Sequence, residues 1–190
     1  MVDWIERMDM EANGLMYKQV IAKPSKKEYE LPNEEFDEVT YNMRLWQSPS
    51  LSLFDAPLES QEGAEEEEVK TDHLILMSHK AAEISIDKIK CQAFKKALQS
   101  MKRNEKCRFT VSEEFLAENE DEGMEEFFAG TAWDKTKAFV MDVELLKLIK
   151  VEDWYKDRST VMRTLRKGKG RSPYTDSLIY FRLKIEVNGN

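Results

Sequence analysis

The chain has 190 residues, of which 41% are hydrophobic and 35% are charged, a composition typical of a soluble globular protein with one complete domain and part of a second. Its 29 Lys and Arg residues against 37 Asp and Glu residues give a net charge of −8, which argues against a general nucleic-acid or membrane-surface binder because both need a positive field. No apolar run approaches the ~20 residues that span a bilayer, and the N-terminus lacks the basic and apolar regions of a secretory signal.

The first part of the chain is predicted to be mostly extended. Residues 1–15 are amphipathic and acidic at their start, and we expect a linker or a helix there. Apolar and polar residues then alternate over Leu15–Ala22 and Glu38–Trp46, which predicts two strands. Two shorter strands are expected at Leu51–Phe54 and His73–Met77.

An acidic insertion, residues 56–72, separates these two short strands. From residue 59 to residue 72 it contains seven acids against one lysine and no aromatic residue. Such a composition cannot bury enough apolar surface to offset the entropy of ordering, so we expect a flexible loop.

The following part combines one helix with the strongest strand signals. Gln92–Met101 places its apolar residues at helical spacing on a single stripe, which predicts a half-buried helix. Alternation predicts strands at Glu105–Val111 and Lys137–Ile149, the second of which is apolar enough to be central in its sheet. Between them, residues 113–126 hold eight acids and no base, and we expect the apolar residues within and after this block to anchor part of it.

These elements predict an α+β domain in which one helix packs on an antiparallel sheet. A weak repeat relates Val2–Arg7 to Glu152–Arg158, and an apolar and basic strand follows each copy. We therefore expect a complete domain over 16–150, a linker over 151–160 and the opening strands of a second copy over 161–190.

The usual catalytic constellations are missing from the sequence. The histidines, His73 and His79, are six residues apart with no nearby cysteine, which disfavours a zinc site. No serine lies in a nucleophile elbow, and Gly168 and Gly170 lack the spacing of a phosphate-binding loop. If the chain is an enzyme, it uses no nucleophile, metal or cofactor.

One class of enzyme is compatible with that absence. The segment 140–148 (VMDVELLKL) resembles the last strand of the FKBP-type peptidyl-prolyl isomerases, and 97–107 resembles the end of their helix and the turn that follows. Val39-Thr40-Tyr41 and Phe54-Asp55 are similar to two further motifs of the family, in the correct order. The resemblance covers about 135 residues, and it implies an FKBP-like half-barrel sheet wrapped around one short helix.

The resemblance also implies a proline pocket, whose residues here are Tyr41, Phe54, Asp55, Cys91, Phe94 and Met141. Tyr41 and Asp55 match a tyrosine–aspartate hydrogen-bond pair, whereas Phe94 stands in place of the usual tryptophan floor and Met141 in place of a phenylalanine. Ala117 falls where a tyrosine hydroxyl normally bonds the substrate, so that interaction is lost. Phe127 and Phe128, in the acidic loop, are either core anchors or contacts for a partner.

Two readings of function follow from this uneven pocket. The first is a degenerate FKBP-like domain of a multidomain immunophilin, similar to a co-chaperone or to the Pasticcino type, that works as a protein-interaction module. The second is an active proline isomerase. The implied partners are proteins, either a heat-shock chaperone or proline-containing segments, and with two cysteines and no disulfide framework we expect the cytoplasm, with the nucleus as an alternative. A third reading, nucleic-acid binding through 156–171, depends on seven basic residues alone.

Overall fold

The computed structural model describes residues 7–24, 30–32, 35–47, 75–118, 122–134, 136–157, 159–166, 168 and 170–184. The predicted strands at Leu51–Phe54 and the acidic insertion 56–72 lie outside these residues, as do Phe54 and Asp55.

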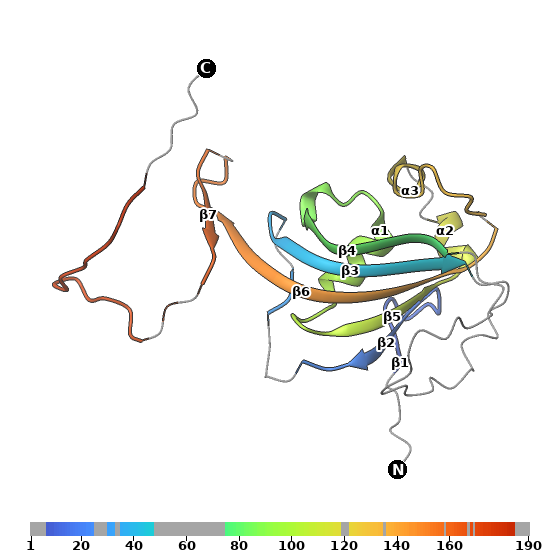
Figure 1. The fold of residues 1–190 in the computed structure, drawn as a ribbon, viewed down its shortest axis with the longest axis horizontal. Helices are drawn as coiled ribbons and strands as arrows, with labels where there is room; N and C mark the ends of the chain where they lie inside the picture. Colours follow the sequence, from blue (N-terminus) through green and yellow to red (C-terminus); the bar gives the residue numbers. More distant parts are fainter. Residues whose placement is uncertain are drawn as a thin grey trace, which may run out of the picture.

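An antiparallel sheet forms the body of the domain (Figure 1). Its strands are β1 (Arg7–Asp9), β2 (Met16–Ala22), β3 (Glu38–Gln47), β4 (Ile75–Ser85), β5 (Lys106–Val111) and β6 (Phe139–Asp153), and β7 (Val161–Thr164) pairs with the far end of β6. The order is β1-β2-β5-β6-β3-β4, so the long apolar strand β6 is central, as its sequence predicts.

In the part of the chain that the structure describes, four helical segments accompany the sheet: η2 (Ile86–Lys88), α1 (Gln92–Gln99), α2 (Glu113–Glu118) and α3 (Glu122–Phe127). The sheet curves around α1, and α2 and α3 lie at one end of it (Figure 1). The apolar stripe of α1, formed by Ala93, Phe94, Ala97 and Leu98, is buried in the main core together with side chains of β3, β5 and β6. The predicted α+β class and the predicted core helix are therefore confirmed.

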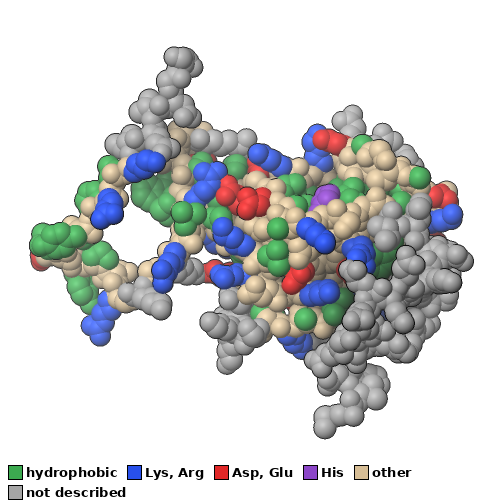
Figure 2. All heavy atoms as spheres, in the orientation of Figure 1, with side chains coloured by type: hydrophobic (Ala, Val, Ile, Leu, Met, Phe, Trp, Pro, Cys, Tyr) green, Lys and Arg blue, Asp and Glu red, His purple; other side chains and the backbone are tan. Residues whose placement is uncertain are grey.

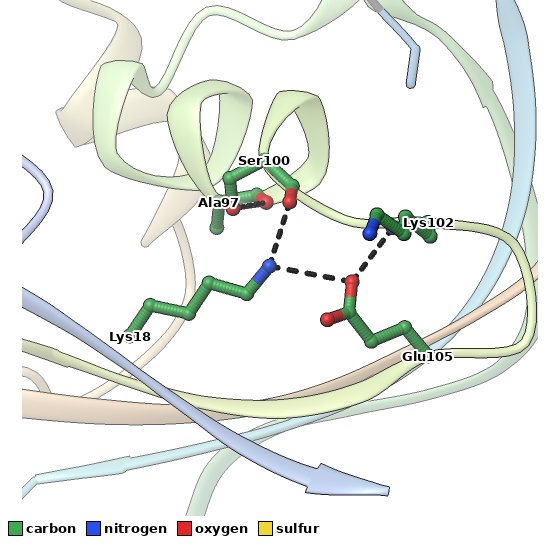
Figure 3. A network of polar contacts seen from close by, with 5 residues as sticks. All are labelled: Lys18, Ala97, Ser100, Lys102 and Glu105. Atoms are coloured by element: carbon green, nitrogen blue, oxygen red, sulfur yellow. Dashed lines mark hydrogen bonds and ion pairs between the residues drawn. The ribbon is translucent and has the colours of Figure 1, made fainter. Parts of the chain in front are cut away.

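A buried polar network ties β2 to the end of α1 (Figure 3). Lys18 Nζ donates to the carbonyl oxygen of Ser100 at 2.6 Å and lies 3.3 Å from Glu105 Oε2. The same carboxylate oxygen accepts the backbone N–H of Lys102 at 2.7 Å. Lys18 and Glu105 are each 6% exposed, so this pair is shielded from water and fixes the turn between α1 and β5.

The expectation of a linker or helix over residues 1–15 is wrong for Arg7–Asp9, which form β1 and pair with β2. The turn between the two strands explains the difference. The Asp9 carboxylate accepts the backbone N–H groups of Glu11 and Gly14, and Gly14 adopts φ = 76°, a conformation that glycine adopts without strain. A local side-chain contact thus closes a hairpin that hydrophobic periodicity does not reveal.

The acidic block 113–126 contains two short helices that the sequence analysis did not predict. Ser112 precedes the first of them, and its Oγ accepts the backbone N–H of Phe115 at 3.2 Å, as an N-cap does. Glu113 and Glu114 then lie in the first turn of α2, where negative charge is favourable. The expected anchoring is present, because Phe115 and Leu116 are buried in the core.

The C-terminal part differs from the expectation in two ways. β6 continues to Asp153, so its last residues belong to a β6–β7 hairpin rather than to the predicted linker 151–160. Residues 178–184, which belong to the predicted opening strands of a second copy over 161–190, have no strand partner among the described residues and extend away from the sheet (Figure 1). Hydrophobic and basic side chains lie on the surface of this part of the chain (Figure 2), and the hydrophobic ones are all more than half exposed: Leu178, Ile179, Tyr180, Phe181 and Leu183.

Candidate functional site

Tyr41 and Phe94 form the centre of the candidate site. Tyr41 lies on β3 and Phe94 on α1, and their rings meet edge to face with centroids 5.1 Å apart. Both side chains belong to the buried core, as does Met141 of β6. Cys91 belongs to the same core, so the fold brings four of the predicted pocket residues into one cluster.

His79 is a partner of Tyr41 that the sequence did not indicate. The Tyr41 hydroxyl is hydrogen-bonded to His79 Nδ1 at 3.0 Å, and burial raises the pKa of Tyr41. β4 carries this histidine because the strand runs on to Ser85 instead of ending near Met77 as expected. A register irregularity in the β3–β4 ladder, where Ala81 has φ = 47°, separates the Tyr41 and Met43 pairings. No short-range signal in the sequence predicts that irregularity.

Cys91 is the N-cap residue of α1 and is covered by Met124 of α3. The two sulfur atoms, Cys91 Sγ and Met124 Sδ, lie 3.6 Å apart, and both side chains are buried. Neither Cys91 nor Cys107 is in a disulfide. The thiol and the thioether thus pack as adaptable apolar groups at the position where the resemblance implies a ligand contact.

A row of aromatic rings continues from Phe94 to the end of the acidic block. Phe127 lies over Phe94 with ring centroids 5.3 Å apart, and it meets Phe128 edge to face at 5.1 Å. Phe128 stacks on Trp133 at 4.1 Å and contacts Phe139 at 5.4 Å. Phe128 is fully buried and serves as a core anchor, whereas Phe127 is half-buried at the edge of the row.

The backbone of α3 lies directly against the residue before Cys91. A Cβ atom added to Gly123 would lie 2.6 Å from both the carbonyl oxygen and the Cβ of Lys90, which is closer than real Cβ contacts. An exposed ion pair between Lys90 and Glu126 joins the same two segments. Only glycine at position 123 allows this approach.

The chain after α3 is tied to β3 by a pair of amide hydrogen bonds. Gln47 Nε2 donates to the carbonyl oxygen of Asp134 at 2.7 Å, and the backbone N–H of Asp134 donates to Gln47 Oε1 at 2.9 Å. Hydrogen bonds from Thr136 and the nearby Lys137 hold the pKa of the Asp134 carboxyl at about 2. These hydrogen bonds fix the C-terminal end of residues 122–134, the segment whose first part is α3.

Ala117, the last of the predicted pocket positions, lies on the exposed side of α2. Among the described residues no group of three or more His, Cys, Asp or Glu side chains is arranged to hold a metal ion. Within the same residues, every helix is too short or too polar to cross a membrane. What the arrangement offers chemically is a closed apolar cluster of aromatic rings and sulfur atoms.

No family model matches the sequence, and no curated protein matches it. Solved structures do match the fold. The structure of the three FKBP domains of wheat FKBP73 aligns with a TM-score of 0.60 at 19% identity, over 88% of this chain and 58% of that chain. A multi-domain immunophilin from Arabidopsis thaliana aligns with a TM-score of 0.51 at 14% identity, over 84% and 52% of the two chains. The chain therefore has the fold of an FKBP-type domain, and it spans little more than half the length of either structure.

Proposed function

We propose that this FKBP-like domain works as a protein-interaction module of a multidomain immunophilin and has little or no prolyl isomerase activity. Its partners in this proposal are proteins, either a heat-shock chaperone or proline-containing segments.

The observation that carries the proposal is the burial of Phe94. An FKBP-type pocket accelerates X–Pro isomerisation, whose barrier is ~18–20 kcal/mol, by binding the twisted imide in a dry cavity more strongly than the planar one. Phe94 takes the place of the pocket floor, yet it is 1% exposed and lies under Phe127. A proline ring cannot reach it while α3 is in place.

The residues around Phe94 also disfavour prolyl isomerase activity. Ala117 has no hydroxyl to donate to a substrate carbonyl, and the hydroxyl of Tyr41 is bonded to His79. Met141 replaces an aromatic ring of the family pattern. One hydrogen bond and two reduced aromatic surfaces together amount to about 3–5 kcal/mol of transition-state stabilisation, which is a factor of hundreds or more in rate.

A protease-coupled assay with a proline tetrapeptide tests the proposal. We expect the full chain to give no acceleration above the uncatalysed rate at concentrations where an active FKBP domain, run in parallel, completes the reaction. Acceleration comparable to that of the active domain, abolished by a macrolide inhibitor, would overturn the proposal in favour of an active isomerase.

Two variants determine whether any weak acceleration that is measured comes from this pocket. Phe94→Leu removes the ring at the pocket floor, and Gln92→Ala changes the exposed side of the same helix. A rate lost in the first variant and kept in the second belongs to this pocket, whereas a rate kept in both belongs to a contaminant.

A further inference from the structure

We propose that the surface formed by Cys91 and Phe94 is a binding site for a helix with methionine and phenylalanine three residues apart, and that α3 is its resident ligand within the chain. The inference deepens the proposed function and rests on it, because it names the kind of protein segment that the module binds: an amphipathic helix of a partner with the pattern Gly-Met-x-x-Phe.

Two residues of α3 contact two residues at the start of α1, and both pairs have the same spacing in the sequence. Met124 and Phe127 are three apart and lie on one face of α3, and Cys91 and Phe94 are three apart at the start of α1. Met124 contacts Cys91 at 3.6 Å between sulfur atoms, and Phe127 lies over Phe94 at 5.3 Å between centroids. The site thus recognises one turn of helix through two apolar anchors.

The residue before methionine is part of the pattern. Gly123 meets the Lys90 backbone so closely that a Cβ atom would stand 2.6 Å from the Lys90 carbonyl oxygen. Nothing larger than glycine fits there without a shift of the helix, so a partner helix needs its smallest residue at this point. The exposed ion pair between Glu126 and Lys90 adds a weak preference for an acidic residue three positions after the glycine.

α3 is held in a way that permits its replacement by a partner. It has six residues, and helices of that length are marginal without tertiary packing. Its ion pair with Lys90 has both side chains 63% exposed, so this contact contributes little. Phe128, the residue after α3, stacks on Trp133 and contacts Phe139, and these two contacts involve neither Met124 nor the ring of Phe127, so they remain when α3 leaves the site.

The test is a titration with a synthetic peptide of residues 122–134 carrying a fluorescent label. The receptor is the full chain with Met124→Ser and Phe127→Ser, in which the resident helix has lost its anchors. We expect the peptide to bind this variant at least tenfold more tightly than the unmodified chain, whose site is occupied. A control peptide with serine at both anchor positions should bind neither protein.

A second readout comes from the thiol of Cys91. Bound peptide should slow its alkylation in the double variant at least tenfold, because the peptide's methionine takes the place of Met124 over the sulfur. If the double variant does not fold, Phe127→Ala in the full chain replaces it in both measurements. Equal binding of the anchor-free peptide, or no binding of the native peptide at millimolar concentration to a folded variant, would overturn the inference.

The same proteins separate this inference from the proposed function. Isomerase activity of the unmodified chain contradicts the proposed function alone, whereas failure of the peptide to bind contradicts the helix site alone. Tighter binding of a proline-containing peptide than of the helix peptide to the opened variant would overturn the helix site in favour of a proline pocket.

Discussion

Gly123→Ala adds one methyl group where α3 packs against Lys90, and it tests whether this contact keeps α3 in its closed position over Cys91. The added Cβ would lie 2.6 Å from the carbonyl oxygen and the Cβ of Lys90, and two of the three nearest atoms are backbone, so α3 itself has to move. Overpacking of this kind costs about 1–3 kcal/mol. Alanine returns up to about 1 kcal/mol through its better helix propensity. With a mid-range overpacking cost of about 2 kcal/mol, the net cost is about 1–2 kcal/mol, which makes the open position about 5–30 times more populated.

Alkylation of the two cysteines measures that opening. Cys91 lies under Met124 and becomes accessible when α3 leaves, whereas Cys107 lies in the sheet, where burial raises its pKa to about 12 and keeps the thiol protonated. We expect Gly123→Ala to speed labelling of Cys91 about 5–30-fold while Cys107 stays unreactive. Gly168→Ala is the matched control, because open space surrounds Gly168.

Two results would refute this reasoning. If both cysteines react faster by the same factor, the substitution destabilises the whole domain and not only the packing of α3 against Lys90. If Cys91 reacts at the unmodified rate in a folded variant, Met124 does not shield its thiol and the contact with Lys90 is not what holds α3 closed.

Two further predictions concern the core. Lys18→Met leaves the Glu105 carboxylate buried with the Lys102 N–H as a remaining partner, so we expect the free energy of unfolding, measured in urea titrations, to fall by about 3–5 kcal/mol. Adding Glu105→Gln should restore much of the lost stability. A loss below about 1 kcal/mol would contradict a buried pair. The Cys107 thiol ionises near pH 9 when unfolded but at about pH 12 when folded, so the unfolded chain loses its proton first and stability falls as pH rises above 9. Between pH 8 and pH 10 the unmodified chain should therefore lose about 1 kcal/mol more than Cys107→Ala, and parallel pH profiles would contradict the shift.

The elements that sequence predicts well are those whose pattern is set by one buried face. Strand β3 alternates over its whole length, and α1 repeats its apolar residues at helical spacing, so both are found within two residues of their predicted ends. β6 is found as the central strand for the same reason. Each of these elements buries its apolar side against the same core, so the spacing of apolar residues in the sequence indicates the buried face directly.

The elements that sequence misses depend on single contacts. β1 requires the Asp9 carboxylate to close its turn, and α3 requires Gly123 to meet Lys90, a residue more than thirty positions away. Half of residues 122–127 are acidic and one is glycine, so composition alone favours a loop. The pairing of Tyr41 with His79 likewise depends on an irregular strand ladder that no local pattern encodes.

The smaller ring at position 94 and the phenylalanine at position 127 are best understood together. In the family pattern an indole fills the floor of the pocket, whereas here Phe94 leaves room that the ring of Phe127 occupies at 5.3 Å. Cys91 is likewise matched by Met124, a side chain that adapts to irregular space. The cysteine at position 91 and the smaller ring at position 94 thus each have a counterpart on α3, and independent changes give no reason for both to be matched by one turn of a single helix. The contacts of Cys91 with Met124 and of Phe94 with Phe127 are therefore the two on which the proposed helix site depends.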